Sequence, residues 1–595
     1  MKRFCLVSAL LAVAAFILPT VAENREREIF QLEEATIADI HHAFRSGLLS
    51  PEQLVRMYLA RIDAYDQAGP RLNSYLHVNE HAIDAARALH DEDTNDDHDN
   101  HDAKPLFGVA VIVKDNVDTR DMPTTAGSVA LGGSIPPNDA WIARKLRRAG
   151  AIILGKGSLT EFANFLTAGM PTGYSSQLRR QLFQRGGDLA TVGYGFNPYD
   201  PRPDPRKEFN DGRPALATGG SSSGPAIAVA ANLATVGVGT ETSGSILSPA
   251  TQNLLVGIKP TVGLVSRTGI IPITADQDTA GPVARTVNDA AKLLGVLAGY
   301  DPQDLATAAC LTPGKCFSDY TRFLKKDALR GVRIAVPHWT YWTDNNHNVN
   351  LSAEQQQVMN DAIEVLRAEG AYVEDFHEIP TQQELINFPG CGALPIPANC
   401  STVLLYGFKR DLNAYLSTLG PSALVHTLAD VIAYNNANAS VALKYGQVLA
   451  ISANSLNTDP GSGDTIRYQK DRAKDVDIAK TRGLDVVYKD FDAILFPANR
   501  GANIAARAGY PSIVVPAGFV PNPAVPPPPL PPPTPFPDGF DAQDAPYGVT
   551  FSGPAFSEPL LIGLAYAFEQ ATQHREPPAS TPPLPSDIVR ERHHN

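Results

Sequence analysis

The sequence predicts an α/β protein in which a central sheet is covered by helices on both faces. Continuous apolar runs at residues 109–113 and 151–154 are typical of strands buried on both sides. Segments with helical periodicity lie before and between such runs, as in residues 51–65 and 353–368. Because buried strands alternate with helices along most of the chain, we expect a layered α/β fold.

Local signals justify the individual elements. Ser50 and Pro51 form a helix start, with Ser as the N-cap, Pro at the first helical position and Gln53 three residues after the cap. Asn138 is a candidate cap for the helix that carries Trp141. The first strand ends abruptly at a lysine, Lys114. Further strands are predicted at residues 332–336, 493–496 and 512–515, and a further helix at 557–572.

The composition describes a large globular protein. The chain has 595 residues, of which 43% are hydrophobic and 19% charged. Length alone would suggest several domains, but the order of the motifs favours one large domain. The formal net charge of −13 disfavours nucleic acid as a partner, since phosphate binding requires clustered Lys and Arg.

The N-terminus predicts export. Lys2 and Arg3 precede an apolar stretch, residues 6–18, which is too short to span a bilayer comfortably. Small residues at 20–22 offer a cleavage site, so residues 1–22 form a predicted signal peptide and 23–595 the mature chain. An uncleaved membrane anchor is the alternative interpretation. We expect a secreted, extracellular protein without stable membrane insertion after cleavage.

The cysteines agree with an oxidising compartment. Cys5 lies in the signal, which leaves an even number in the mature chain. Three pairings are possible, and the short spacings favour Cys310–Cys316 and Cys391–Cys400. The CxxC-like spacing of a metal site is absent. Acceptor patterns for glycosylation start at Asn350, Asn399 and Asn438.

Three segments resemble surface insertions on a core of about residues 33–574. An acidic run near residues 91–104 predicts a solvated loop, and metal binding by its His98 and His101 is the less favoured interpretation. Residues 170–213 lack periodicity and predict a long loop near the candidate site. Residues 521–540 are proline-rich and predict extended polyproline II structure.

The most informative stretch contains two loops of glycine and serine. Residues 219–224 read Gly-Gly-Ser-Ser-Ser-Gly, and residues 240–245 read Thr-Glu-Thr-Ser-Gly-Ser. A small-residue helix (226–233) and a strand (235–239) separate them. Glycine lets the backbone approach a ligand closely. Flexible linkers do not carry core elements, so the pattern indicates a functional site.

Two motif interpretations compete with the one that we favour. Residues 220–224 match G-x-S-x-G, which would make Ser222 the nucleophile of an α/β-hydrolase-type esterase. That motif needs a buried strand before the turn, and residues 213–218 do not form a convincing one. Residues 150–157 approach a phosphate-binding loop, but Gly157 stands where Ser or Thr should bind magnesium. We reject the phosphate loop.

The third interpretation follows from a resemblance to the amidase signature family of serine hydrolases. The region 237–287 is most similar to the branch that contains bacterial peptide amidases, and weaker similarity covers most of the mature chain. The matching motifs are Lys114-Asp115-Asn116, residues 219–224, residues 239–246, residues 257–263 and residues 278–282. Departures from the family pattern are Glu241, Ser243 and Pro225.

The resemblance implies a fold and a set of catalytic roles. It implies a single domain with a mixed β-sheet. It assigns Ser245 as the nucleophile, Ser221 as a serine reached through a cis peptide bond, and Lys114 as the base. The backbone N–H groups of Thr242, Ser243, Gly244 and Ser245 would form the oxyanion hole.

The chemistry is coherent without the resemblance. A serine attacks an amide only if another group takes its proton, and these motifs contain no histidine. A neutral lysine can accept that proton, and burial at the end of an apolar strand lowers a lysine pKa. Ser221 would pass the proton between Ser245 and Lys114.

These observations predict a secreted amidase that cleaves a carboxamide into an acid and ammonia or an amine, without metal or cofactor. The expected substrate is a small-molecule or peptide amide; its identity and the oligomeric state are left open. An amidotransferase A-type subunit that supplies ammonia to a partner enzyme is the alternative. The predicted signal and disulfides argue against it. An inactive binding protein on the same scaffold is disfavoured because all three relay residues are present.

Overall fold

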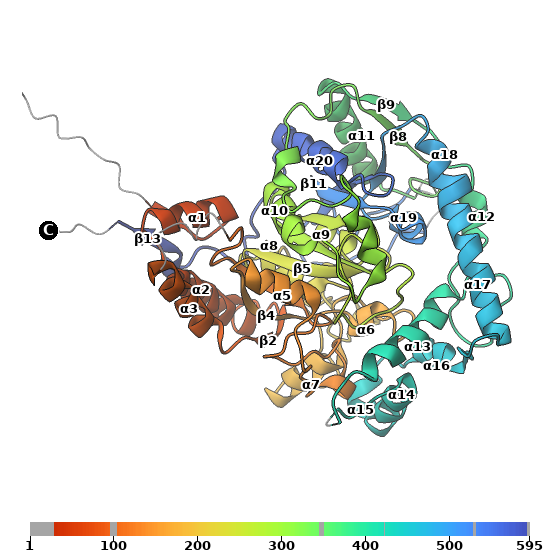
Figure 1. The fold of residues 1–595 in the computed structure, drawn as a ribbon, viewed down its shortest axis with the longest axis horizontal. Helices are drawn as coiled ribbons and strands as arrows, with labels where there is room; N and C mark the ends of the chain where they lie inside the picture. The colour runs from red at the N-terminus through yellow and green to blue at the C-terminus, as the bar shows by residue number, and fades with distance from the viewer. Residues whose placement is uncertain (1–28, 96–103, 344–349, 422, 528–530, 592–595) are drawn as a thin grey trace, which may run out of the picture.

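A computed structural model describes residues 29–95, 104–343, 350–421, 423–527 and 531–591. Its centre is one mixed sheet of eleven strands with helices on both faces (Figure 1). This architecture confirms the predicted fold class, including the mixed strand directions. The strands of the sheet, in spatial order, are β2 (Tyr75–Val78), β4 (Ile152–Gly157), β3 (Ala110–Lys114), β5 (Val236–Glu241), β7 (Thr279–Ala284), β6 (Val256–Lys259), β11 (Ser512–Val520), β12 (Ala545–Ser552), β10 (Ala493–Pro497), β8 (Arg333–Val336) and β9 (Tyr372–Asp375).

The site-bearing strands are parallel neighbours. β3 pairs with β4 on one side and with β5 on the other, both in parallel. Parallel strands end at the same edge of a sheet, so the residues that follow β3 and β5 are brought together there. Lys114 ends β3 and Glu241 ends β5. The topology therefore places the lysine next to the second glycine–serine loop.

The strands are buried on both faces, as their apolar runs predict. In β3, Val111 and Val113 join one hydrophobic core, whereas Ala110 and Ile112 join a second core on the other face. This alternation follows from the two-residue period of a strand. The first core is completed by α5 (Trp141–Arg148), α10 (Val287–Leu297), α11 (Ala353–Ala368) and α20 (Glu558–Thr572), and the second by α1 (Ile37–Arg45), α2 (Pro51–Arg61), α3 (Ala82–Asn95), α8 (Ser223–Ala230) and α9 (Leu247–Gln252).

A third group of helices packs beside the sheet rather than on its middle (Figure 1). Its own apolar core includes Phe408 and Leu412 of α13, together with Phe162 and Phe165. The helices on this side of the molecule are α6 (Glu161–Asn164), α7 (Ser176–Gln184), α13 (Val403–Leu416), α14 (Leu428–Ala437), α15 (Ala439–Ala442), α16 (Val448–Ser455) and α17 (Gly463–Val476). The first core of the sheet also receives residues from α12 (Gln382–Ile386), α18 (Asp485–Val487) and α19 (Ala502–Ala508).

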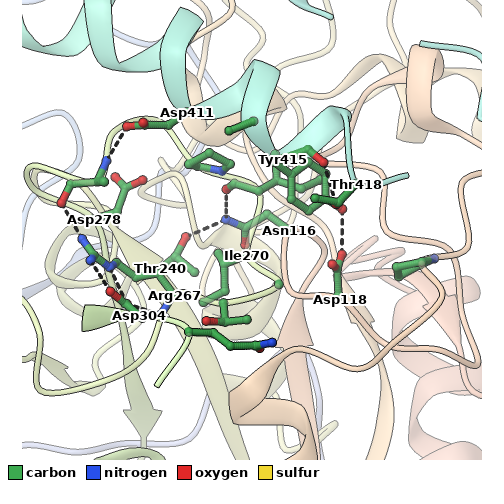
Figure 2. Close-up of a pocket in the computed structure, with 18 of the residues that line it drawn as sticks. Asn116, Asp118, Thr240, Arg267, Ile270, Asp278, Asp304, Asp411, Tyr415 and Thr418 are labelled. Carbon is green, nitrogen blue, oxygen red and sulfur yellow. Dashed lines mark hydrogen bonds and ion pairs between the residues drawn. The ribbon is translucent and has the colours of Figure 1, made fainter. Parts of the chain in front are cut away.

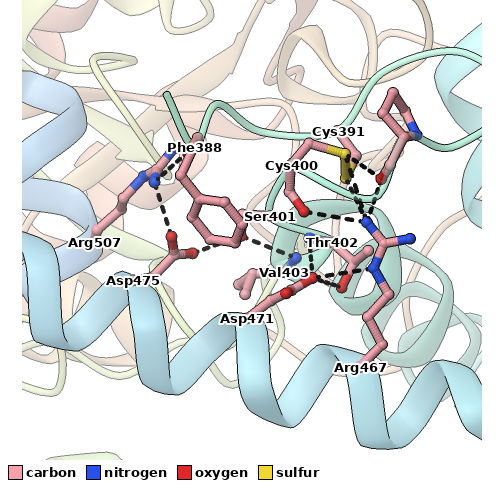
Figure 3. The surroundings of a disulfide bond; sticks show 11 residues. Phe388, Cys391, Cys400, Ser401, Thr402, Val403, Arg467, Asp471, Asp475 and Arg507 are labelled. Atoms are coloured by element: carbon pink, nitrogen blue, oxygen red, sulfur yellow. Dashed lines mark hydrogen bonds and ion pairs between the residues drawn. A yellow bond between two sulfur atoms is a disulfide. The ribbon is translucent and has the colours of Figure 1, made fainter. Parts of the chain in front are cut away.

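Two disulfide bonds form with the predicted pairing, Cys310–Cys316 and Cys391–Cys400. The second lies where the chain enters α13 (Figure 3). Arg467 of α17 donates to the Cys400 carbonyl at 3.2 Å. Asp471 of α17 accepts from the Thr402 N–H at 3.0 Å, so the start of α13 is fixed against α17.

The two ends of the described chain are joined. β1 (Ile29–Gln31) pairs antiparallel with β13 (Ile588–Arg590). Next to this ribbon, Arg61 of α2 donates to Asp587 at 2.5 Å, and neither side chain is exposed. Arg61 also donates to the carbonyls of Asn232 and Thr581 at 2.9 and 2.8 Å. The C-terminal segment is thereby fastened to α2, the second helix after the N-terminal strand.

Several sequence expectations need correction. Residues 170–213 are not wholly loop, because α7 forms where the Ser175 hydroxyl caps the Leu178 N–H and Leu178 packs against Leu76 and Leu159. The predicted acidic loop begins late, since α3 continues to Asn95. Ala140, not Asn138, is the N-cap of α5.

Some sequence predictions concern residues that the structure does not describe. The predicted signal peptide, His98 and His101 all lie outside the described residues. In the described part, no helix is both long and apolar enough to cross a membrane. The division into a signal and a mature domain with three surface insertions stays a prediction.

Candidate active site

The lysine at the end of β3 is fully buried. Lys114 Nζ donates to Ser221 Oγ at 2.7 Å, to Thr240 Oγ1 at 3.0 Å and to the Thr240 carbonyl at 3.1 Å. Burial lowers the pKa of Lys114 from 10.5 to about 7, while the charges of Asp278 and Glu241 act in the opposite direction. A substantial fraction of this amine is therefore neutral near pH 7 and can accept a proton.

Ser221 lies on the first glycine–serine loop, directly before α8. The Gly220–Ser221 peptide bond is cis, as the family resemblance implies. Ser221 is fully buried, and its carbonyl accepts from the Thr160 N–H at 3.1 Å. A Cβ at Gly224 would lie 2.2 Å from the Ser158 nitrogen, so only glycine permits this close approach.

Ser222 joins the two serine loops through its own bonds. Its N–H donates to the Ser245 carbonyl at 3.2 Å. Its hydroxyl donates to the Thr240 carbonyl at 3.1 Å and accepts from the Thr240 N–H at 3.2 Å. The hydroxyl is buried and has both a donor and an acceptor, so it is engaged in holding β5. The hydrogen bonds of the Ser222 hydroxyl argue against Ser222 as the nucleophile of an elbow motif. That motif also requires a strand directly before the turn, and residues 215–218 form none.

Ser245 lies between β5 and α9 and is 7% exposed. The Glu241 carboxylate organises this loop: it accepts from the Gly244 N–H at 2.7 Å, the Ile246 N–H at 2.7 Å and the Leu247 N–H at 3.0 Å. Gly244 has φ of +87°, a conformation that favours glycine. Glu241 therefore both shapes the turn that carries Ser245 and occupies N–H groups at the start of α9.

The predicted oxyanion-hole amides divide into two groups. The Gly244 N–H was expected in the oxyanion hole, but it donates to the Glu241 carboxylate instead. Within the described residues, the N–H groups of Thr242, Ser243 and Ser245 have no acceptor. Ser243 is partly exposed and is not in the left-handed region, so its Cβ is accommodated without backbone strain. Three amides around Ser245 can thus still receive an anion.

A cavity of about 820 Å³ opens beside this centre (Figure 2). Thr240 and Thr242, which flank Glu241, lie in its wall. Figure 2 shows α13, with Asp411 and Tyr415, on one side of the cavity and Asp304 on the other. A small molecule in this space would contact the loop that carries Ser245. The cavity has the size of a substrate site. Its wall reaches the Ser245 loop through Thr242, whereas Ser245, Ser221 and Lys114 are not part of the wall.

Two carboxyl groups in the cavity wall have strongly shifted acidity. Burial raises the pKa of Asp278 to about 7, against the lowering effect of its hydrogen bond from Thr242. That bond, from Thr242 Oγ1 to Asp278 Oδ1, is 2.5 Å long. Burial likewise raises the pKa of Asp118 to about 7. Such shifts cluster at functional sites.

The sequence identified the lysine and the serines but missed several neighbours. Asn116 and Asp278 belong to the matching motifs, but the sequence gives no role for either. Tyr415 carries no local signal, because α13 brings it to the site from far along the chain. Among the described residues, no group of three or more His, Cys, Asp or Glu is arranged to hold a metal ion.

Fold and site together define an α/β enzyme with a buried lysine and two serine loops at the edge of a mixed sheet. The chain belongs to the Amidase family, whose model matches residues 53–562. It is an amide-hydrolysing enzyme of the amidase signature type.

Known proteins agree with this assignment. A probable amidase of Arabidopsis thaliana is 36% identical over 567 residues, which cover 94% of each chain. The crystal structure of a peptide amidase from Stenotrophomonas maltophilia is 35% identical, with a TM-score of 0.73 over 92% of this chain and 99% of that one. The A-type subunit of a glutamyl-tRNA(Gln) amidotransferase from Exiguobacterium sibiricum is 29% identical over 564 residues, which cover 91% of this chain and 98% of that one.

Proposed function

We propose that this enzyme hydrolyses small carboxamides through an acyl-enzyme on Ser245, with Ser221 and Lys114 as the proton relay. The observation that carries the proposal is the 2.7 Å contact between Lys114 Nζ and Ser221 Oγ in a fully buried setting. The Ser222–Ser245 backbone bond supports it, because it holds the two loops together next to that contact.

The relay runs in one direction for acylation. Ser245 Oγ attacks the amide carbonyl carbon and gives its proton to Ser221 Oγ, while the Ser221 proton passes to neutral Lys114 Nζ. The N–H groups of Thr242, Ser243 and Ser245 would receive the negative oxygen of the tetrahedral intermediate. When the C–N bond breaks, the proton returns from Lys114 through Ser221 to the leaving nitrogen.

Water completes the cycle. It attacks the acyl carbon and gives its proton through Ser221 to Lys114. When the bond between the acyl carbon and Ser245 Oγ breaks, that proton returns through Ser221 to Ser245 Oγ, and the carboxylic acid is released. A free lone pair on Lys114 is needed at the start of each half-reaction. The lowered pKa of Lys114 supplies it near neutral pH.

The substrate class follows from the relatives and the cavity. We propose primary carboxamides of amino acids and short peptides, because the Stenotrophomonas maltophilia relative is a peptide amidase. The cavity of about 820 Å³ has room for such molecules. Ammonia release from amino-acid amides, C-terminal peptide amides and fatty amides would test the class. Activity confined to fatty amides would contradict it.

Two alternatives remain distinguishable by experiment. An amidotransferase A-type subunit is suggested by similarity to such subunits over most of the chain. The purified chain alone should release ammonia from a carboxamide, whereas an amidotransferase subunit would need its partner subunits to do so. An esterase based on Ser222 would lose activity in Ser222→Ala and retain it in Ser245→Ala; we expect the reverse.

We further propose secretion, with cleavage after Ala22. The two disulfide bonds support an oxidising compartment. N-terminal sequencing of the chain from culture medium should begin near Glu23, and retention inside the cell would contradict the proposal. Asn399 and Asn438 are exposed, so both are available for glycosylation in a host that glycosylates secreted proteins. A glycosidase-induced gel shift would test it.

A further inference from the structure

The carboxylates in the cavity wall differ in how well the protein satisfies them. Asp304 pairs with Arg267 at 2.6 Å, Asp411 with Arg410 at 2.6 Å, and Asp139 with Arg147 at 3.2 Å. Their charges are matched within the protein. Arg144, a further cation in the wall, donates to the Asp139 carbonyl and lies over the Trp141 ring.

Asp278 has no such cation, but its oxygens are occupied. Asp278 Oδ1 accepts from Thr242 at 2.5 Å, and Oδ2 accepts from the N–H groups of Ile273 and Thr274 at 2.8 and 2.9 Å. Those bonds fix the loop beside the candidate oxyanion hole. Asp278 is therefore a poor candidate for a ligand contact.

Asp118 has acceptor capacity left over. It is 7% exposed and lines the cavity, and the Tyr415 hydroxyl donates to its Oδ1 at 2.8 Å. No Lys or Arg of the described chain lies within ion-pair distance of it. The nearby Lys156 charge lowers the pKa of Asp118, but the Lys156 ammonium pairs with Asp115 at 3.4 Å. The Lys156 ammonium is also held by Thr124 Oγ1 at 2.7 Å. A buried carboxylate without a cation is costly unless a ligand supplies one.

A second observation at the same wall points to a hydrogen-bond donor. Asn116, two residues before Asp118, is 2% exposed and also lines the cavity. Its Nδ2 donates to Thr240 Oγ1 at 3.0 Å and to the Ile271 carbonyl at 3.2 Å, which fixes the amide plane. Its Oδ1 has no partner in the part of the chain that the structure describes. The cavity wall thus carries one carboxyl group without an ion-pair partner and, two residues earlier in the chain, one unused neutral acceptor (Figure 2).

We propose that Asp118 and Asn116 Oδ1 form a subsite for an ammonium group on the acyl part of the substrate. This inference rests on the proposed hydrolysis at Ser245 and narrows its substrates to carboxamides that carry a primary ammonium. An ammonium has three donors and a positive charge, which suits a carboxylate and an amide oxygen together. Burial raises the pKa of Asp118 to about 7, and a bound ammonium would favour its ionised form.

The test is a length series of carboxamides. Primary amides with a terminal ammonium on one to six methylene groups are compared with neutral alkanamides of the same length, and kcat/KM is measured from ammonia release. We expect one length at which the ammonium substrate is hydrolysed at least tenfold more efficiently. Equal hydrolysis of both series at every length would overturn the subsite and leave the hydrolase intact. No hydrolysis of any amide would instead contradict the proposed function.

Matched variants locate the preference. Asp118→Asn should lower kcat/KM tenfold or more for the favoured ammonium substrate, mainly through KM, and change the neutral amide by less than threefold. Asp411→Asn is the control, because it removes a carboxylate from the same cavity that already has an arginine partner. Equal loss of the preference in both variants would show a diffuse negative field and contradict a defined subsite.

A measurement on the unmodified enzyme keeps the proposal testable if Asp118→Asn fails to fold. Linear alkylammonium ions should inhibit hydrolysis of a neutral amide competitively, and alcohols of the same length should inhibit at least tenfold more weakly. Equal inhibition by the two series would refute the ammonium subsite.

Discussion

Replacing the buried lysine should remove activity and yet stabilise the fold. The pKa of Lys114 is about 7 in the folded chain against an ordinary 10.5, because burial disfavours the charged amine. This difference corresponds to a penalty of about 5 kcal/mol on folding at pH 7, at about 1.36 kcal/mol for each pKa unit. Lys114→Met keeps most of the buried volume and has no charge to desolvate.

The hydrogen bonds that Lys114 makes offset part of that gain. Thr240 keeps partners without the lysine, since Ser222 donates to its carbonyl and Asn116 to its hydroxyl. Only Ser221 Oγ loses its donor, which costs about 1–3 kcal/mol. We therefore expect Lys114→Met to raise the free energy of unfolding by about 2–4 kcal/mol at pH 7.

The pH dependence isolates the charge from the packing. The unfolded lysine binds a proton up to about pH 10.5, whereas the folded lysine releases it above about 7, so the wild-type chain gains stability between these values. The advantage of Lys114→Met should shrink by about 2 kcal/mol from pH 7 to pH 9. Urea unfolding of both chains at the two pH values measures it. An advantage that stays constant, or a variant that is less stable at both, would refute the burial of a neutral amine.

Because the relay needs a neutral Lys114 amine, kcat/KM should rise with pH and reach half its maximum near pH 7. A kcat/KM that stays constant from pH 5 to 9 would contradict the role of Lys114 as the general base. Glu241→Gln should lower kcat by about 10–100-fold with little change in KM. The Glu241 carboxylate accepts hydrogen bonds from three backbone N–H groups, whereas the glutamine side chain has only one oxygen to accept them. Steady-state kinetics would measure this effect, and an unchanged kcat would mean that the turn holds without the carboxylate. Arg61→Met should destabilise the fold by about 3–5 kcal/mol because it leaves the Asp587 carboxylate buried without its partner. The double variant Arg61→Met with Asp587→Leu should recover part of this loss, as measured by thermal unfolding. An Arg61→Met variant as stable as the wild type would exclude the ion pair as an anchor.

Local pattern predicted the elements that form the centre of the fold. The helix at residues 353–368 has the expected limits, and β3 ends at Lys114 as its apolar run indicates. Such runs are informative because a strand buried on both faces favours an almost continuous series of apolar residues. β12, which completes the sheet between β11 and β10, was not predicted. Its run is broken by Gly548 and Thr550, and its pairing depends on strands far away in sequence.

The site was predictable where its residues lie in compact motifs. Lys114, Ser221 and Ser245 occupy such motifs, and parallel pairing of β3 with β5 brings their loops together. The role of Glu241 could not be read from the sequence, because it depends on the direction in which three backbone N–H groups point. The contact between Tyr415 and Asp118 joins residues almost three hundred positions apart, and no local pattern records it.

The identity of the acylated residue tests the central claim most directly. A fluorophosphonate should modify the wild-type enzyme once, and fragmentation of the proteolytic peptide that contains Ser221, Ser222 and Ser245 should place the adduct on Ser245. Labelling should be lost in Ser245→Ala, lowered at least a hundredfold in Lys114→Met, and retained in Ser222→Ala. An adduct on Ser222, or unimpaired labelling of Lys114→Met, would contradict a serine nucleophile that depends on a buried neutral lysine.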